Sequence, residues 1–127
     1  MKPGPLARSD RNLTALVLED SVLLLLDLQE ALLGLGVGTV LKASSIYRAL
    51  SVLESSQPDF AIVDYDIDGT TSLMFVDELI RRAVPLLLVT GYGPDINLPA
   101  QYRGLPLLAM PFSMSELEAK INGLFEC

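Results

Sequence analysis

Three apolar stretches of this chain each end on residues that can bind a metal ion or donate hydrogen bonds to an anion. Glu19 and Asp20 follow the stretch 13–18, Asp64 follows 60–63, and Thr90 and Gly91 follow 85–89. Short β-prone apolar runs predict strands that are buried on both faces of a parallel sheet. The carboxyl ends of such strands meet at one edge, where open α/β folds bind their ligands. The sequence therefore predicts three carboxylates, a hydroxyl and a backbone amide at one edge of a sheet.

Carboxylates gathered in this way predict a magnesium site. Like charges at close range repel one another and raise each other's pKa unless a cation lies among them. Mg²⁺ suits one or two carboxylates together with carbonyl, water and phosphate oxygens. A phosphoryl group on Asp64 would complete such a shell, and the Thr90 hydroxyl and Gly91 amide could donate to its oxygens. The alternative for Asp20 is that it only caps a helix.

Apolar periodicity and capping residues predict five strands that alternate with helices. We expect strands at 13–18, 37–42, 60–64, 85–89 and 105–109, and helices that begin near Ser21, Ser44 or Ser45, Ser72 and Ser113. This alternation with short loops predicts an α/β domain, a doubly wound five-stranded parallel sheet with right-handed crossovers. The domain covers 13–127, and the polar, Pro- and Gly-bearing segment 1–12 is expected to be a mobile arm.

Several local features refine this expectation. Ser113 and Glu116 have the spacing of a capping box. Pro106 argues that the last strand lies at a sheet edge, and the breakers in 94–102 predict a fourth helix that is short or irregular. The buried positions are expected to include Leu73, Val76 and Ile80 in the third helix and Met114, Leu117, Ile121 and Leu124 in the last.

Composition excludes several classes of function. The net charge of −7 disfavours nucleic acid as a partner, because an acidic chain repels the phosphate backbone. The chain has no His and a single Cys, Cys127, so His-based catalysis, His metal sites and internal disulfides are excluded. No stretch is apolar enough to span a membrane, and the first residues lack the apolar core of a signal peptide. We therefore expect a cytoplasmic protein without a membrane partner.

Two other motifs overlap the central acidic segment. Asp64, Asp66, Asp68 and Gly69 match the opening of an EF-hand loop, but the twelfth position is Phe75, where a bidentate Glu is required. The run 66–70 resembles the first motif of haloacid-dehalogenase-type phosphohydrolases, with Asp66 as nucleophile and Asp68 as acid. Those enzymes also need a later acidic pair for Mg²⁺, and no strand end after Asp95 supplies one.

The motifs together resemble a bacterial two-component receiver domain over 13–125. The resemblance rests on Leu18-Glu19-Asp20, 58–64, 88–91 and Pro111-Phe112, and the run from Thr90 to Pro106 is similar to a stand-alone receiver subgroup. It implies a flavodoxin-like sheet of order 2-1-3-4-5. It also implies Asp64 as phosphoacceptor, Mg²⁺ held by Glu19, Asp20, Asp64 and the Asp66 carbonyl, and Thr90 as the hydroxyl that follows the phosphoryl group.

The resemblance implies a signalling domain in a phosphorelay rather than an enzyme, with a histidine kinase or phosphotransfer protein as donor. Without an output domain it would act by docking or as a phosphate sink. Two positions depart from the family pattern: Met110 occupies the place of a Lys, and Leu107 that of a frequent aromatic residue. Because Met cannot pair with a phosphoryl group, the alternative is a receiver-like interaction module that works without phosphorylation.

Overall fold

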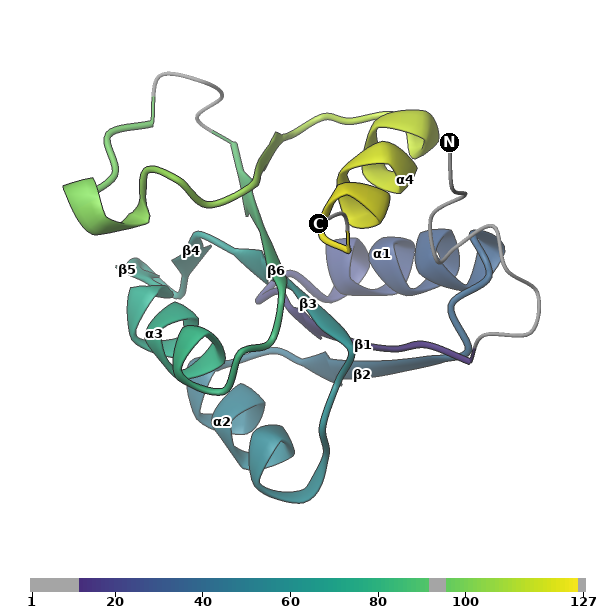
Figure 1. The fold of residues 1–127 in the computed structure, drawn as a ribbon, viewed down its shortest axis with the longest axis horizontal. Coiled ribbons are helices and arrows are strands. Elements are labelled where there is room, and N and C mark those ends of the chain that lie inside the picture. Colours follow the sequence, from purple (N-terminus) through teal and green to yellow (C-terminus); the bar gives the residue numbers. More distant parts are fainter. Residues whose placement is uncertain (1–11, 92–95, 126–127) are drawn as a thin grey trace.

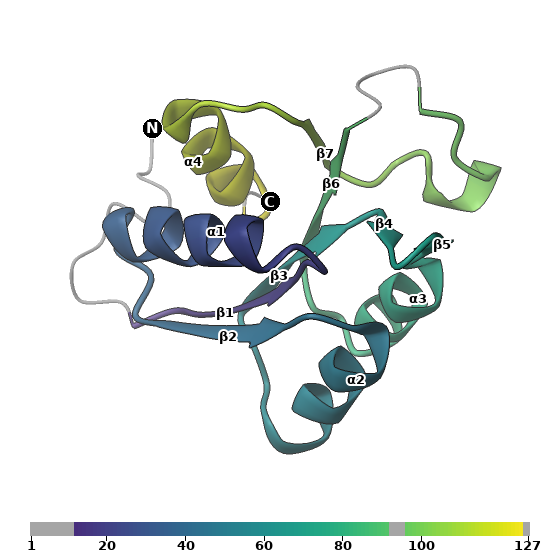
Figure 2. The ribbon, with the colours of Figure 1, turned by 180° about the vertical axis from the view of Figure 1, so that it is seen from behind.

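The computed structural model describes residues 12–91 and 96–125, so most of the predicted arm 1–12 lies outside the described residues. Five parallel strands form one sheet in the order β2-β1-β3-β6-β7. Counted over these five strands, this is the predicted order 2-1-3-4-5. The helices α1 and α4 cover one face of the sheet, and α2 and α3 cover the other (Figures 1 and 2). The predicted doubly wound α/β fold is therefore confirmed.

The strands of the sheet are β1 (Thr14–Leu18), β2 (Thr39–Ala43), β3 (Phe60–Asp64), β6 (Leu86–Thr90) and β7 (Leu107–Ala109). The helices are α1 (Val22–Gly34), α2 (Ile46–Ser55), α3 (Leu73–Arg81) and α4 (Met114–Gly123). A small antiparallel hairpin, β4 (Asp66–Ile67) with β5 (Thr70–Thr71), and a 3-10 turn at Ala100–Tyr102 complete the regular elements of the described residues.

The central strands are apolar throughout because each of their faces meets a separate core. In β3, Phe60 and Ile62 pack toward α1 and α4, whereas Ala61 and Val63 pack toward α2 and α3. All four side chains are at most 1% exposed. This two-sided burial fixes the direction of β3 and holds its last residue, Asp64, at the carboxyl edge of the sheet.

Local signals place most helix ends correctly. Ser21 and Ser45 cap α1 and α2 by accepting backbone hydrogen bonds, and Ser113 with Glu116 forms the predicted capping box. β7 begins only at Leu107, because Pro106 has no N–H to donate and contributes only its carbonyl, which accepts from Leu88 N at 3.0 Å. The position of β7 at the edge of the sheet was predicted from Pro106.

The predicted inward positions of two helices are partly wrong. In α3 the buried residues include Phe75, Val76 and Leu79, whereas Ile80 is 50% exposed. Leu79 lies on the same face of α3 as Phe75 and Val76 at helical spacing, so it meets the core in place of Ile80. The buried Ser72 hydroxyl, at the start of the helix, donates to the Asp64 carbonyl at 2.6 Å. Met114 is 48% exposed, because α4 begins there at the rim of the core.

The connection between β6 and β7 carries no long helix in the described residues. Residues 96–99 have no regular secondary structure, and only the 3-10 turn follows. The Tyr102 hydroxyl donates to Asp77 Oδ1 at 2.7 Å and ties this turn to α3. The prediction for 94–102 is thus confirmed from residue 96 onward, while 94 and 95 lie outside the described residues. No helix of the described part of the chain is long and apolar enough to cross a membrane.

The burial of Leu79 in place of Ile80 in α3 can be tested by measuring the free energy of unfolding of two variants. We expect Leu79→Ala to lower the free energy of unfolding by about 2–5 kcal/mol, because it removes a fully buried side chain. Ile80→Ala, one position along and half exposed, should cost less than about 1.5 kcal/mol. Urea unfolding followed by circular dichroism measures both. A larger loss in Ile80→Ala than in Leu79→Ala would instead support the rotation predicted from the sequence.

Candidate functional site

Three carboxylates meet at the carboxyl edge of the sheet. Leu18 pairs with Val63 in the parallel register of β1 and β3, so Glu19 and Asp64 follow at neighbouring positions. One carboxylate oxygen each of Glu19, Asp20 and Asp64 lies within 4.8 Å of the others. Glu19 is only 2% exposed, whereas Asp20 and Asp64 are half-buried. The predicted convergence of these three acids is therefore present.

Glu19 is the deepest member of the cluster. Its backbone N–H extends the pairing of β1 with β2 by donating to Ala43 O at 3.1 Å, and its Oε1 accepts from Ser21 N at 2.9 Å. Burial raises the pKa of Glu19 from an ordinary value of 4.5 to about 8, and the neighbouring Asp64 carboxylate adds to this rise. The charged form of this side chain is therefore disfavoured unless a cation lies beside it.

Hydrogen bonds hold the backbone around Asp64 in place. Tyr65 N donates to Val89 O at 2.9 Å, and the Ser72 hydroxyl holds the Asp64 carbonyl. Burial raises the pKa of the Asp64 carboxyl group, and repulsion from Asp20 contributes to the rise. The side chain is half-buried, so its carboxylate lies close to other acids while a reagent can still reach it.

The hairpin that follows β3 positions Asp20. The amide of Asp68 donates to Asp20 Oδ2 at 2.8 Å, and this bond is the main cause that lowers the pKa of Asp20. Asp68 and Gly69 connect β4 to β5 with positive φ values of 51° and 80°, the conformation of a type I′ hairpin turn. Only residues that tolerate the left-handed region fit this turn, which explains the Asp-Gly pair.

Sequence analysis missed two supporting groups here, the Asp68 amide and the Ser72 hydroxyl. The Asp-Gly pair is the usual signal for a tight hairpin, so the turn itself could have been found. The Asp68 amide and the Asp20 carboxylate that accepts its hydrogen bond are 48 residues apart, so no local sequence pattern indicates this contact.

Asp66 does not join the carboxylate cluster of the described residues. It pairs with Thr71 in the hairpin and is half-buried. A phosphohydrolase site built on Asp66 and Asp68 would need these two carboxylates at the centre of the acidic group. The arrangement instead centres on Asp64, with Asp68 contributing its backbone amide.

Thr90 and Gly91 lie at the end of the strand next to β3. Asp64 pairs with Val89, so Thr90 comes one position beyond this pair at the same edge. Thr90 is 1% exposed and its carbonyl accepts from Met110 N at 2.8 Å. Gly91 is exposed, and nothing lies within 4 Å of where a Cβ would be. The position of Gly91 is therefore open toward an incoming group.

Met110 joins the apolar side of the molecule. It is half-buried and packs against the core beneath α1 and α4. The peptide bond from Met110 to Pro111 is cis.

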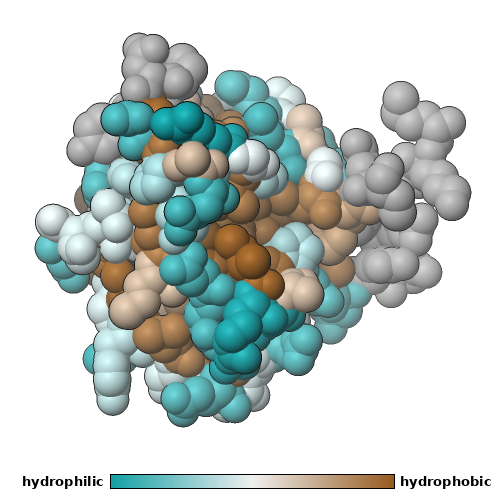
Figure 3. All heavy atoms as spheres, turned by 60° about the vertical axis from the view of Figure 1, so that its left-hand side comes forward, coloured by the Kyte–Doolittle hydropathy of each residue, from teal (hydrophilic) through white to brown (hydrophobic). Residues whose placement is uncertain are grey.

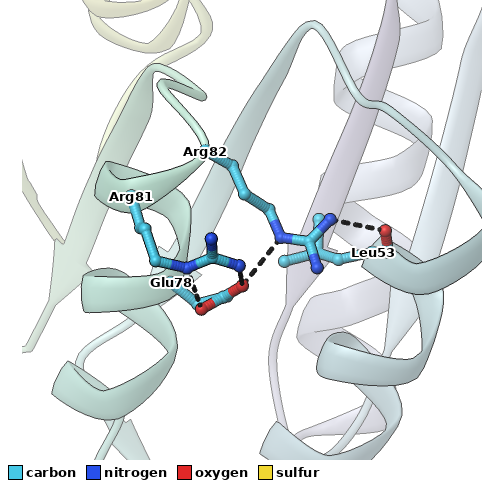
Figure 4. Close-up of polar contacts among 4 residues, drawn as sticks. All are labelled: Leu53, Glu78, Arg81 and Arg82. Atoms are coloured by element: carbon cyan, nitrogen blue, oxygen red, sulfur yellow. Dashed lines mark hydrogen bonds and ion pairs between the residues drawn. The ribbon is translucent and has the colours of Figure 1, made fainter.

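Among the described residues, the two ion pairs join Arg81 and Arg82 to Glu78, and Arg82 also donates to Leu53 O (Figure 4). These contacts lie at the carboxyl ends of α2 and α3, which is the opposite edge of the sheet from the acidic cluster.

The donor set fits a hard divalent cation. Its three carboxylates supply only oxygen ligands, as Mg²⁺ prefers. Burial and the neighbouring acids raise the pKa of Glu19 and of Asp64, so a cation beside them would favour their charged forms. Glu19, Asp20 and Asp64 are therefore the residues that could hold Mg²⁺.

Comparison with known proteins agrees with this geometry. No protein-family model and no curated protein matches the chain, but many solved structures do. The solution structure of SdrG from Sphingomonas melonis Fr1 superposes with a TM-score of 0.78 at 27% identity, over 91% of this chain and 98% of SdrG. A CheY-like response regulator receiver domain from Methylobacillus flagellatus gives 0.75 at 23% identity, over 90% and 99% of the two chains.

A third solved structure is matched over only part of its own length. The anti-anti-sigma factor PhyR from Bartonella quintana gives a TM-score of 0.80 at 20% identity. The match covers 94% of this chain and 49% of PhyR, so this chain spans about half of that protein. The chain therefore has the flavodoxin-like, CheY-like fold of response regulator receiver domains.

The acidic cluster predicts an unusual dependence of stability on pH. The pKa of Glu19 is raised in the folded state, so its contribution is fully present below about pH 4.5 and is lost as pH rises through about 8. We expect the melting temperature in EDTA to fall across this window. Glu19→Gln should flatten the fall, and millimolar Mg²⁺ should largely remove it, since a cation stabilises the charged form. A profile that Glu19→Gln leaves unchanged would contradict this assignment.

Proposed function

We propose that the chain is a receiver domain that accepts a phosphoryl group on Asp64 in a phosphorelay. The observation that carries this proposal is the meeting of Glu19, Asp20 and Asp64 at the carboxyl edge of the sheet, with oxygen atoms within 4.8 Å of one another. The receiver fold of the solved structures supports it. In this assignment, Thr90 and Gly91 receive the phosphoryl oxygens and the Asp66 carbonyl is a further metal ligand.

The transfer takes place between the Asp64 carboxylate and a phosphodonor, beside the acidic cluster that could hold Mg²⁺. An oxygen of Asp64 attacks phosphorus in line as the bond from phosphorus to the donor nitrogen breaks, and the donor imidazole leaves with the electron pair and is reprotonated. Glu19, Asp20 and Asp64 would hold Mg²⁺, which offsets charge on the phosphoryl oxygens when bound. The Asp68 amide keeps Asp20 oriented and ionised. The donor is a histidine kinase or phosphotransfer protein, and the reaction takes place in the cytoplasm.

A second function, partner binding without phosphorylation, is favoured by one observation. Met110 stands where a receiver has a Lys, and its side chain packs with the apolar core rather than supplying a charge. A charge-assisted hydrogen bond from that Lys would contribute about 1.5–3 kcal/mol. Without it, the modified state gains less from drawing Thr90 inward.

The proposed phosphorylation can be tested by intact-protein mass spectrometry. We expect incubation with acetyl phosphate and Mg²⁺ to add one phosphoryl group to the wild-type chain and none to Asp64→Ala. Asp66→Asn is the matched control, because Asp66 lies outside the carboxylate cluster and contributes only its backbone carbonyl. Absence of any gain, from the small donor and from a kinase alike, would favour binding without phosphorylation. Phosphomonoester turnover that Asp66→Asn abolishes would favour a phosphohydrolase.

The absence of a Lys at position 110 predicts that phosphorylation changes the conformation around Thr90 and Gly91 only weakly. With beryllofluoride as a phosphoryl mimic, we expect small amide chemical-shift changes at Thr90 and Gly91 in the wild type and larger ones in Met110→Lys. The reason is that a ligand shifts a conformational equilibrium only by its differential affinity for the two states. A full shift in the wild type that Met110→Lys does not enlarge would mean that another group supplies the positive charge.

A further inference from the structure

Helix α1 is apolar around most of its circumference. Among the described residues, five of the nine exposed large apolar side chains lie on this one helix: Val22, Leu23, Leu24, Leu26 and Leu33. A helix that is apolar on all sides is ordinarily buried on all sides. On the side of the molecule where α3 lies, which Figure 3 brings forward, apolar atoms lie among polar ones. The outer surface of α1 therefore has the composition of a surface that is covered.

One stripe of α1 runs along the edge of the sheet formed by β2. Its members are spaced i, i+4, i+7 and i+11 along the helix: Val22, Leu26, Gln29 and Leu33. This is the spacing of a seam between packed helices, and it extends over about 17 Å at a rise of about 1.5 Å per residue. The Gln29 side chain accepts from Lys42 Nζ at 3.0 Å, which places the stripe beside β2. The three apolar members are 64%, 45% and 46% exposed, in chain order.

Strand β2 presents backbone groups on its outer side. It ends the strand order, and β1 is its one neighbour among the described strands, with α1 lying above this edge (Figures 1 and 2). Thr39 N donates to Leu13 O, so the backbone of Thr39 faces β1. Because successive residues of a strand direct their N–H and C=O groups to alternate sides, those of Val40 and Lys42 point away from the sheet. Outward groups of this kind can pair with another strand.

A twofold axis through Leu41 would pair these outward groups with one another. Two β2 strands that run antiparallel about this axis place Val40 of each copy opposite Lys42 of the other. Both residues direct their backbone groups outward, so each such pair forms a hydrogen-bonded pair of an antiparallel ladder. The axis is perpendicular to the sheet, and the two copies of α1 therefore lie on the same face of the joined sheet. Their exposed stripes then face each other.

The charges of this surface are self-complementary. Lys42 is exposed and is the only charged residue of β2. Helix α1 carries no Lys or Arg, and its exposed acid Glu30 lies one turn from both Leu26 and Leu33 of the stripe. A Lys on an edge strand disfavours pairing unless an acid meets it, and the twofold axis brings Glu30 of the second copy toward it. A partner of one sign of charge would match only one of these two residues, whereas a second copy matches both.

We propose that α1 and β2 form an interface between two copies of this chain. The β2 strands pair antiparallel, the stripes of the two α1 helices pack together, and Lys42 of each copy meets Glu30 of the other. Neither Lys42 nor Glu30 belongs to the carboxylate cluster. The interface needs neither Mg²⁺ nor a phosphoryl group, so it goes beyond the proposed receiver function and does not depend on it.

Sedimentation velocity in EDTA, without a phosphodonor, tests the interface. From micromolar to near-millimolar concentration, we expect the 13.8 kDa chain to shift toward twice that mass. Leu26→Gln and Leu33→Gln should each raise the dimer Kd at least about tenfold, because the twofold axis makes every substitution count twice. Leu24→Gln is the matched control, since Leu24 is also exposed but lines a groove on the opposite side of α1. It should leave the Kd unchanged. Melting temperatures check that each variant is folded.

A charge exchange tests the polar contact. Lys42→Glu and Glu30→Lys should each raise the dimer Kd at least about threefold, because each places like charges together across the axis. The double variant restores the opposite charges in exchanged positions, and we expect its Kd to return toward that of the wild type.

Amide exchange followed by NMR locates the strand pairing. At a concentration where the dimer predominates, the amides of Val40 and Lys42 should exchange slowly in the wild type and in Leu24→Gln. In Leu26→Gln at the same concentration, both amides should exchange rapidly, because the outer side of β2 is then open to water.

Four outcomes would overturn the proposal. The chain stays monomeric at every concentration, or Leu24→Gln weakens the dimer as much as Leu26→Gln, which assigns the contact to the other side of α1. A dimer forms while Val40 and Lys42 still exchange rapidly, which places the contact away from β2. The double charge variant dimerises no better than either single one. None of these results bears on the phosphorylation of Asp64, which is measured separately by mass, so the two proposals fail independently.

Discussion

The confinement of like charges at one sheet edge is the constraint on which this structure depends. The parallel register of β1 and β3 brings Glu19 and Asp64 to adjacent positions, and two-sided burial of both strands prevents them from moving apart. Repulsion and desolvation at this edge are opposed by two backbone amides, those of Ser21 and Asp68. Burial and the neighbouring acids nevertheless raise the pKa of Glu19 and of Asp64. A site strained in this way is suited to a cation and to chemistry that changes its charge.

The same chain segments also line an apolar groove between α1 and the segment from Met110 to Met114. Helix α1 begins directly after the acidic pair and then lines the groove between Leu24 and Ala31. The segment after β7 does likewise, because the Met110 amide holds the Thr90 carbonyl at the acidic edge while its side chain enters the groove wall. Position 110 is thus shared between a polar site and an apolar one.

The fold was predicted wherever a periodic pattern continued over a whole element. The apolar runs of β3 and β6 and the serine caps of α1, α2 and α4 were sufficient for type, order and approximate bounds. Prediction failed where packing between elements decided the outcome. In α3, Leu79 rather than Ile80 shares the buried face with Phe75 and Val76. The hairpin after β3 was not predicted, although its Asp-Gly pair carries a local signal.

By itself, the sequence determined that acids and a hydroxyl end three buried strands, because strand direction and burial follow from local apolar runs. It also determined that position 110 has no positive charge. Tertiary structure decided which acids meet: Asp64 with Glu19 and Asp20, and not Asp66, since register between strands sets distances that spacing along the chain cannot. It alone decided that the Asp68 amide holds Asp20 across 48 residues and that Met110 faces α1 in a groove. Such contacts depend on packing between elements, for which the chain carries no local pattern.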